Sequence, residues 1–437
     1  MSATVLRGRT LSFRDMPGSH DDHASYLFEE DGAVAVKNGL IAASGSHDKV
    51  RKQFPDAETV DHRPHLIMPG FIDTHLHFPQ AQVIGSFGTK LLDWLNTYTF
   101  VEEQKFADPA HCERMATHFF DNLLRNGTTT AVAYCSVHKT SAEAFFSEAQ
   151  RRNLRMIGGK VMMDRNAPDA LCDTPQSSYD DSKELIARWH GQGRALYAIS
   201  PRFAITSTPT QLEMAQTLTE EHPECYVQTH LSENQAEIDL TLDLYQSARD
   251  YLDVYEMYGL LGEKSLFGHC LHLGGRERAA MAETGSVAVF CPTSNLFLGS
   301  GLFDEDGLRG HGVRTAVATD IGGGTSYSML KTLDEAYKVL QLKNQVLNPL
   351  KSFCMMTLGN ARALQLEHRI GTLEAGSEAD LVVLDSHATA AMRLRMETVR
   401  TLAEELFVLQ TMADDRAIAG VYAAGKACHP DLSDDSN

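Results

Sequence analysis

The sequence predicts an α/β protein, a (β/α)8 TIM-like barrel with a small discontinuous β-sandwich built from both chain ends. Three observations predict this fold. The chain has 437 residues, which suits one large barrel and a smaller accessory unit. Apolar runs typical of buried strands alternate with amphipathic stretches of helical length through the middle of the chain. The two chain ends instead consist of short strand-like segments joined by turns.

The strand-like segments at the two ends are each too short for an independent core. Examples are Thr4–Phe13 near the N-terminus and Ile370–Asp385 near the C-terminus. Pairing both ends in one unit buries the apolar face of each. We therefore predict a small β-sandwich domain formed by residues 1–68 and 371–437, with a catalytic barrel of residues 69–370 inserted between them.

Eight strand candidates occupy the barrel region, and they read as nearly continuous apolar runs, as strands buried on both faces should. They are Met68–Thr74, Thr129–Cys135, Arg155–Met163, Tyr197–Phe203, Tyr226–Thr229, Ser265–Gly268, Ser286–Phe290 and Arg314–Thr319. One clear intervening helix spans Pro109–Arg125, with Asp108 as its expected N-cap and Gly127 just past its end. A doubly wound open sheet is the alternative arrangement of such alternating elements.

Composition excludes several functional classes. The formal charge is −19, which argues against nucleic acid as a partner because phosphate binding needs clustered Lys and Arg. The eight cysteines are dispersed, so the chain has no CxxC zinc or redox motif, and unpaired cysteines suggest a reducing compartment. The sequence shows neither a signal-peptide core nor an apolar run of about 18 residues. We therefore expect a cytoplasmic protein with no membrane segment.

Metal-ligand side chains occur at the carboxyl ends of four predicted strands, which meet at one mouth in a parallel barrel. They are His75, His77, His230, Glu233, His269 and Asp320. The two histidines of the HxH pair point to the same side of an extended chain and can bind one ion together. Three imidazoles, from His75, His77 and His230, with the Asp320 carboxylate and no thiolate suit zinc, with iron or manganese possible.

Each of these residues has a non-catalytic interpretation when it is considered alone. A single HxH pair in a strand is more often structural, and His269 could be a hydrogen-bonded core histidine. Asp320 could cap a helix, and Glu233 could be a solvated loop acid. The occurrence of such residues at four separate strand ends favours a catalytic metal site, in which water occupies the remaining open position.

At this point the sequence resembles the amidohydrolase superfamily. PGFIDTHLH at Pro69–His77 is similar to its opening motif, and GTLEAGSEADLVVLD at Gly371–Asp385 resembles its return to the small domain. Within the superfamily the chain is similar to the guanine deaminases, through segments between about residues 68 and 343. These segments are HFPQ, LLDWLNTYTF, NGTTTAVAY, GKVMMDRNAPD, ISPRFAITS, THLSEN, FCPTSNLFLGSGLF and TDIGGGTSYSMLKTLDEAYKVLQL.

The resemblance implies a cytoplasmic, homodimeric enzyme that hydrolyses guanine to xanthine and ammonia with one Zn²⁺ per chain. It implies that the metal ligands are His75, His77, His230 and Asp320. Lys160 lies on the third predicted strand rather than the fourth, where dinuclear relatives carry a bridging lysine, so we interpret it as structural.

The resemblance also implies catalytic roles for three of these side chains. Asp320 accepts the proton of the attacking water, Glu233 transfers protons to the ring and the leaving amine, and His269 orients the hydroxide. The residues expected to contact substrate are Gln80, Arg202, Phe203, His230, Glu233 and Asp320.

Alternatives remain for the substrate-binding residues. Arg202 could instead pair with a surface acid, and Phe203 could be a core residue. Leu91, Leu92, Trp94 and Leu95 could roof the site, but we favour core packing for them. The alternative functions are deamination of another aminopurine, a pterin or a triazine, and a non-catalytic barrel used as a scaffold.

Overall fold

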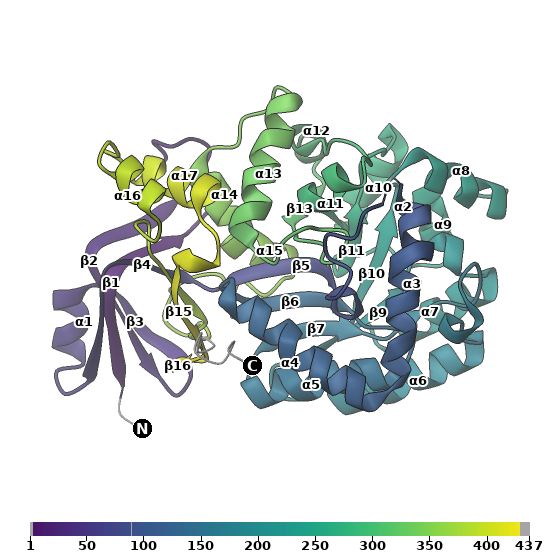
Figure 1. Ribbon diagram of the computed structural model, residues 1–437, viewed down its shortest axis with the longest axis horizontal. Coiled ribbons are helices and arrows are strands. Elements are labelled where there is room, and N and C mark those ends of the chain that lie inside the picture. Colours follow the sequence, from purple (N-terminus) through teal and green to yellow (C-terminus); the bar gives the residue numbers. More distant parts are fainter. Residues whose placement is uncertain (1–2, 89, 429–437) are drawn as a thin grey trace.

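The computed structural model describes residues 3–88 and 90–428, so the last nine positions of the predicted C-terminal segment lie outside the described residues. Two sheets organise the molecule. A sheet formed from both chain ends lies beside a barrel that is ringed by helices (Figure 1). Within the described residues, no helix is long and apolar enough to cross a bilayer.

The predicted barrel is confirmed. Its eight strands run parallel in chain order, which rules out the doubly wound alternative with its reversed strand order. They are β5 (Phe71–His77), β6 (Thr128–Tyr134), β7 (Arg155–Gly159), β9 (Leu196–Pro201), β10 (Tyr226–Leu231), β11 (Ser265–His269), β12 (Val287–Phe290) and β13 (Arg314–Val317). A short additional strand, β8 (Val161–Met162), pairs with β9.

A buried asparagine joins the first and last barrel strands, between which the hydrogen-bonded ladder is interrupted. Asn360 Nδ2 donates to the carbonyls of Ile72 (2.7 Å) and Val317 (2.8 Å), and its Oδ1 accepts from Val317 N (2.9 Å). Thr74 Oγ1 also donates to Val317 O, at 3.1 Å. These side-chain bonds satisfy backbone groups that would otherwise be buried without partners.

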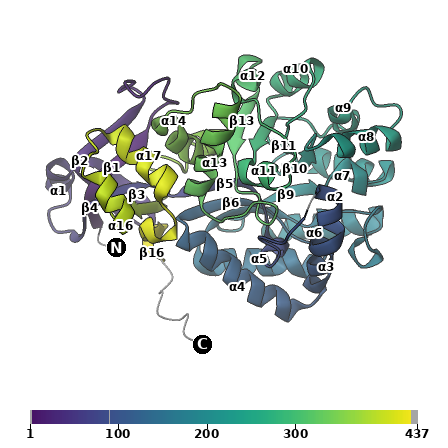
Figure 2. The ribbon, with the colours of Figure 1, turned by 45° about the horizontal axis from the view of Figure 1, so that its top comes forward.

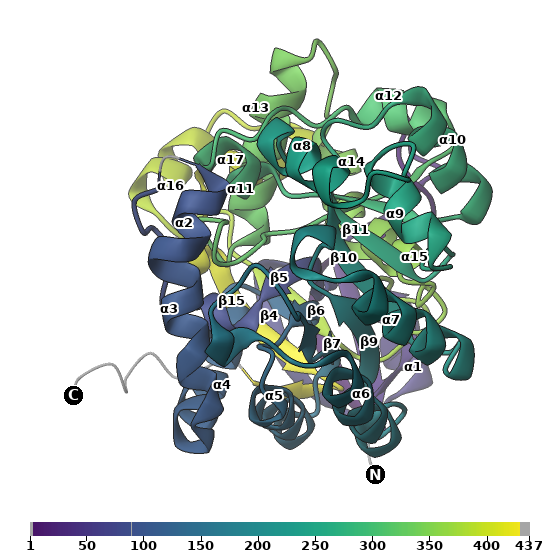
Figure 3. The same ribbon diagram turned by 90° about the vertical axis from the view of Figure 1, so that its right-hand side faces the viewer.

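Helices surround the barrel on its outer face (Figure 3). The predicted helix Pro109–Arg125 is confirmed as α4, with Asp108 accepting from Ala110 N as its N-cap. The others are α5 (Lys139–Arg152), α6 (Pro175–Trp189), α7 (Pro209–Glu221), α8 (Gln235–Leu244), α9 (Tyr251–Met257), α10 (Gly275–Thr284), α11 (Pro292–Phe297), α12 (Glu305–Gly310), α13 (Met329–Leu342), α14 (Pro349–Cys354) and α15 (Asn360–Ala363). Before α4, the chain forms a series of short helical turns: η1 (Phe78–Gln80), α2 (Leu91–Trp94), η2 (Leu95–Thr99), α3 (Phe100–Glu103) and η3 (Gln104–Ala107).

The barrel interior is packed with apolar side chains that come from every strand. They are Ile72, Val132, Ile157, Ala198, Tyr226, Leu266, Val287, Val289 and Ala316. Leu364, Leu366 and Ile370, which follow α15, belong to the same buried cluster. Because this core fills the interior, a binding site has space only at the carboxyl end of the strands.

The sheet from the chain ends has seven strands in the order β16-β15-β14-β4-β1-β2-β3. They are β1 (Thr4–Phe13), β2 (Tyr26–Lys37), β3 (Leu40–Ser46), β4 (Glu58–Pro69), β14 (Leu381–Leu384), β15 (Ile418–Ala423) and β16 (Lys426–Ala427). Three helices accompany it: α1 (His47–Gln53), α16 (Ala390–Met396) and α17 (Leu402–Met412), of which α16 and α17 lie beside the N-terminal strands (Figure 2). The domain boundaries given above stay a prediction.

The predicted first barrel strand, Met68–Thr74, is wrong in its bounds. Met68 belongs to β4, and the barrel strand begins at Phe71 and continues to His77. The break falls at Gly70, where a Cβ atom would lie 2.2 Å from Thr129 Oγ1. The third predicted strand is likewise divided at Lys160, whose ammonium group pairs with Asp173.

A buried ion cluster connects the barrel to the returning chain. Glu378 lies between Arg155 at the start of β7 and Arg194 before β9, with Arg155 Nε 2.8 Å and Arg194 Nε 3.0 Å from its Oε2. Arg194 also pairs with Asp380. Burial alone would raise the pKa of Glu378, but the two arginines hold it below its ordinary value.

We expect Glu378→Gln to lower the free energy of unfolding by about 2–3 kcal/mol, because two buried guanidinium groups lose their shared counter-charge. Urea denaturation measures this. The control is Asp31→Asn, which breaks an exposed pair with Arg7 and should cost less than about 1 kcal/mol. Equal effects of the two substitutions would contradict the prediction.

Candidate functional site

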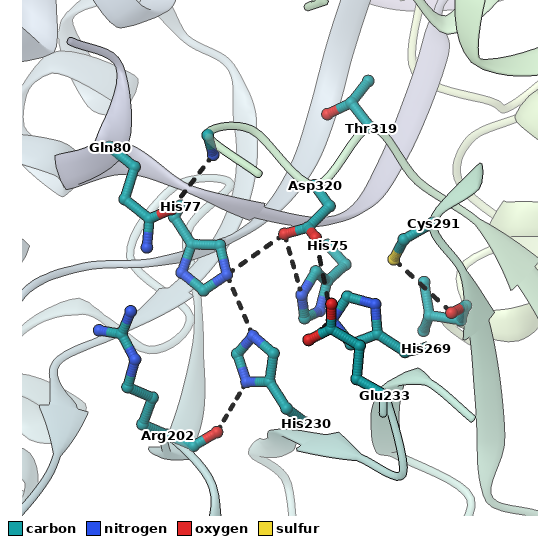
Figure 4. Close-up of polar contacts among 12 residues, drawn as sticks. His75, His77, Gln80, Arg202, His230, Glu233, His269, Cys291, Thr319 and Asp320 are labelled. Atoms are coloured by element: carbon teal, nitrogen blue, oxygen red, sulfur yellow. Dashed lines mark hydrogen bonds and ion pairs between the residues drawn. The ribbon is translucent and has the colours of Figure 1, made fainter. Parts of the chain in front are cut away.

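Four potential ligand atoms converge at the barrel mouth. His77 Nε2 lies 3.2 Å from His230 Nε2, and Asp320 Oδ1 lies 3.4 Å from Nε2 of both His75 and His77 (Figure 4). Two atoms that each bond one ion at about 2.1 Å in tetrahedral geometry lie about 3.4 Å apart. These separations therefore match the edges of a coordination polyhedron around a single cation.

The donor chemistry of this cluster also fits a metal ion. His75 Nε2 is buried and makes no hydrogen bond to any described residue. Burial and the neighbouring histidines hold the pKa of His230 well below its ordinary value, which leaves the ring neutral with a free lone pair. Burial would raise the pKa of Asp320, but its interactions with His75 and His77 hold it well below the ordinary value. The cluster thus pairs a carboxylate with imidazoles, of which His77 and His230 have lowered pKa values.

The hydrogen bond at the other nitrogen of His230 determines how this ring presents itself. Nδ1 lies 2.7 Å from the backbone carbonyl of Arg202, which can only accept. Nδ1 therefore carries the proton, and the lone pair of Nε2 faces His75, His77 and Asp320.

Local backbone conformation positions the other side chains of the site. Ser232, His269 and Asp320, at the ends of three strands, have φ of 50°, 74° and 54°. Non-glycine residues rarely adopt the left-handed region, and such strain concentrates at functional sites. Gly268 provides the space for His75, since a Cβ atom there would lie 2.5 Å from His75 Cε1.

Glu233 is buried beside this cluster and is held at both its backbone and its carboxyl group. Its N–H donates to Glu237 Oε2 at 2.8 Å, at the N-terminus of α8. Ser300 Oγ donates to its Oε1 at 2.8 Å, while Oε2 lies 3.5 Å from His269 Nε2. Burial, Glu237 and Asp320 raise the pKa of Glu233 well above its ordinary value, which favours the protonated form of this acid.

His269 faces both acids of the site. Its Nε2 lies 3.5 Å from Glu233 Oε2 and 3.8 Å from Asp320 Oδ2. Asn295 Nδ2 lies 2.8 Å from His269 Nδ1 and donates to it, which places the ring proton on Nε2. Burial lowers the pKa of His269 to about 3, so it is a neutral hydrogen-bond donor toward the centre of the site.

The three substrate-contact candidates, Gln80, Arg202 and Phe203, line the same pocket as His77, His230, Glu233, His269 and Asp320. Leu91, Trp94 and Leu95 also line it, and the same three residues pack in an apolar cluster, as we favoured, so they combine core packing with lining of the site. Leu92 packs in the adjoining apolar cluster and is not among the pocket-lining residues.

Arg202 pairs with an acid, although not one at the surface. Its Nη1 lies 3.0 and 2.7 Å from the two carboxyl oxygens of Glu103, which is 1% exposed. Gln80 Nε2 donates to Glu103 Oε1 at 2.9 Å, and Gln80 Oε1 accepts from Gly322 N at 3.3 Å. Lys160, paired with Asp173, is not among the pocket-lining residues.

Sequence reasoning missed four residues of this site: Glu103, Glu237, Asn295 and Ser300. Glu103 and Glu237 sit in acidic helical turns that read as solvent-exposed. Asn295 and Ser300 fall in the segment FCPTSNLFLGSGLF, which resembled the family but suggested no role by itself. None of the four lies at a sequence spacing that predicts its role. Glu103, Asn295 and Ser300 contact residues distant in the sequence, and Glu237 contacts Glu233 through the turn that begins α8.

Comparison with known proteins gives a consistent result. Residues 66–428 match the model of the amidohydrolase family. The chain is 48% identical to the guanine deaminase of Escherichia coli (strain K12), covering 97% of each protein, and 30% identical to that of Homo sapiens, covering 84% of this chain and 83% of the relative.

Solved structures agree with these sequence relatives. The E. coli guanine deaminase structure has a TM-score of 0.95 at 45% identity and covers 97% of this chain and 99% of its own. A guanine deaminase from C. acetobutylicum with guanine bound in its active site has a TM-score of 0.88 at 27% identity, covering 98% of this chain and 100% of its own.

We expect the purified protein to hold about one transition-metal ion per chain, because four ligand atoms lie at coordination spacing. His230→Ala should reduce metal content after dialysis to well under half of that value. Elemental analysis by mass spectrometry measures both. His20→Ala, which changes an exposed histidine, is the control. Absence of metal from the wild type, or full retention in His230→Ala, would contradict the assignment.

Proposed function

The chain belongs to the amidohydrolase family, and we propose that it hydrolyses guanine to xanthine and ammonia with one Zn²⁺ per chain, held by His75, His77, His230 and Asp320. The observation that carries this proposal is the approach of both His230 and Asp320 to the His75–His77 pair, next to a pocket that Glu233, Gln80 and Arg202 line. The names of the similar proteins support the choice of guanine.

The ligand set supports zinc because it combines neutral imidazoles with one carboxylate and leaves an open position for water. When bound, zinc supplies a water whose pKa is near 7, so that hydroxide is available at neutral pH. Asp320, whose pKa is well below its ordinary value, is the ionised group that accepts the proton of this water. The neutral Nε2–H of His269 donates to the attacking oxygen and orients it.

Glu233 has the complementary task of delivering protons to the substrate. Because its surroundings favour the protonated form, it can protonate a ring nitrogen as the oxygen adds to C2. The resulting carboxylate then takes up the proton that Asp320 received and passes it to the amino group. The tetrahedral centre at C2 then collapses: the C–N bond breaks, ammonia leaves, and the hydroxyl proton of the added oxygen returns to the Glu233 carboxylate. One water is consumed, xanthine remains, and both acids regain their starting states.

Recognition of the purine uses the polar groups opposite Glu233. Arg202 donates to the oxygen at C6, and Gln80 offers one N–H and one lone pair to the ring edge. Phe203 packs against the ring system. Adenine places an amino group where Arg202 needs an acceptor, so the pocket disfavours it.

Two further assignments belong to this proposal. A cytoplasmic location is supported by the cysteines, all of which are free among the described residues. Assembly as a homodimer rests on the preference of soluble enzymes for closed symmetric pairs.

The substrate assignment is tested by spectrophotometric comparison of guanine, adenine, cytosine and melamine. We expect kcat/KM for guanine to exceed each of the others by about 100-fold or more, because a buried arginine left without an acceptor penalises the alternatives. If another aminopurine, a pterin or a triazine is the best substrate, the assignment to guanine is wrong. If none is deaminated by metal-loaded protein, the scaffold alternative gains support.

Glu233→Gln should keep the metal and the fold but lower kcat by about 100- to 10,000-fold, because an amide cannot transfer the protons. Steady-state kinetics with parallel metal analysis measures this. Glu283→Gln, the same change at an exposed position on α10, should leave kcat unaltered. Near-normal turnover by Glu233→Gln would refute the shuttle role.

A further inference from the structure

One wall of the pocket contains a buried acid to which the reaction gives no role. Glu103, at the end of α3, contacts Arg202 through both carboxyl oxygens and Gln80 through Oε1. All three residues are at most 3% exposed. We call Gln80, Glu103 and Arg202 the polar wall. Because neither Gln80 nor Arg202 is near Glu103 in sequence, the fold brings this trio together.

Helix α3 holds the guanidinium of Arg202 from two sides. Phe100 and Glu103 are three residues apart and therefore share one face of the helix. The Arg202 guanidinium carbon lies 5.4 Å from the centre of the Phe100 ring, in cation–π contact, while Nη1 donates to Glu103. These two contacts limit the orientations that Arg202 can adopt, and its remaining donors are available to the pocket that it lines.

Glu103 also fixes the orientation of the Gln80 carboxamide. A carboxylate accepts but does not donate, so the Gln80 atom facing it must be Nε2. Gln80 Oε1 then faces Gly322 N, which can only donate. The carboxamide is therefore held in one of its two orientations, with one N–H and one lone pair left for a ligand.

Glu103 also determines the charge of the polar wall. A buried guanidinium without a counter-charge attracts any anion that can reach it, and losing one partner of a buried pair is costly. Glu103 supplies this counter-charge inside the wall, so the Arg202–Glu103 pair presents directed hydrogen-bond donors with no net charge. A neutral purine gains the hydrogen bonds, while an anionic purine gains no additional attraction.

We propose that Glu103 is a positioning and specificity-determining residue. It orients Arg202 and Gln80 toward the 6-oxo edge of the substrate, and its charge prevents tight binding of anionic purines, including the deprotonated product. This inference rests on the proposed function. It attributes the selectivity among purines to Glu103, which acts by holding the two residues that contact the substrate, Arg202 and Gln80.

The test compares Glu103→Gln with Glu102→Gln, the same change at the neighbouring position, where the carboxylate pairs with Lys105 away from the pocket. In Glu103→Gln we expect kcat/KM for guanine to fall about 10- to 100-fold, with unchanged metal content. The affinity for 2-aminopurine, which lacks the 6-oxygen, measured as a competing ligand, should change less than about threefold. Glu102→Gln should resemble the wild type in every measurement.

The pH dependence of xanthine binding distinguishes the proposed electrostatic role of Glu103 from a purely structural one. Its affinity is measured by calorimetry below and above the first ionisation of xanthine. In Glu103→Gln, ionisation should tighten binding by about tenfold, because Arg202 then has no counter-charge. In the wild type it should not tighten binding. In the Arg202→Ala background, Glu103→Gln should cost guanine less than it does in the wild type, because only the contact with Gln80 remains to be lost, and ionisation should no longer tighten xanthine binding.

Several outcomes would overturn the proposal. They are equal losses for guanine and 2-aminopurine, no difference in the pH dependence of xanthine binding between Glu103→Gln and wild type, and additive effects of the two substitutions. Failure of the wild type to deaminate guanine would instead refute the proposed function. The xanthine measurement does not require turnover and would still decide the role of Glu103.

Discussion

The geometry of the site depends on one electrostatic constraint, the approach of several lone pairs to a common point. Nε2 atoms of His77 and His230 lie 3.2 Å apart, and Asp320 Oδ1 lies 3.4 Å from His75 and His77. Neutral imidazole nitrogens repel one another when their lone pairs converge, and a buried carboxylate is costly without a counter-charge. A cation at the centre would accept these lone pairs and neutralise the carboxylate, so a bound ion would stabilise this arrangement of side chains.

Such convergence requires a rigid frame, because a side chain displaced by about one ångström no longer bonds the ion. The barrel provides it by packing its interior from every strand and by joining β5 to β13 through the Asn360 carboxamide. The strain is local. It appears as left-handed backbone at Ser232, His269 and Asp320, where the strands end and the side chains turn into the mouth.

The sequence predicts the residues that follow buried strands and fails for those that support them. His230, His269 and Asp320 could be predicted because an apolar run ends at each, and a parallel barrel brings these ends together. Glu103 could not, since an acid in a polar helical turn has the pattern of a solvated side chain until the fold buries it. Leu91, Trp94 and Leu95 both pack in an apolar cluster and line the pocket, and apolar helical spacing alone does not separate these two roles.

The site contains two carboxyl groups whose environments shift their pKa values in opposite directions. Asp320 and Glu233 are both buried, yet neighbouring imidazoles keep the pKa of Asp320 low, whereas burial and the nearby acids Glu237 and Asp320 raise that of Glu233. The negative charge of Asp320 thus favours the neutral form of Glu233. Since Oε1 of Glu233 is held by Ser300, Oε2 is the oxygen that faces His269.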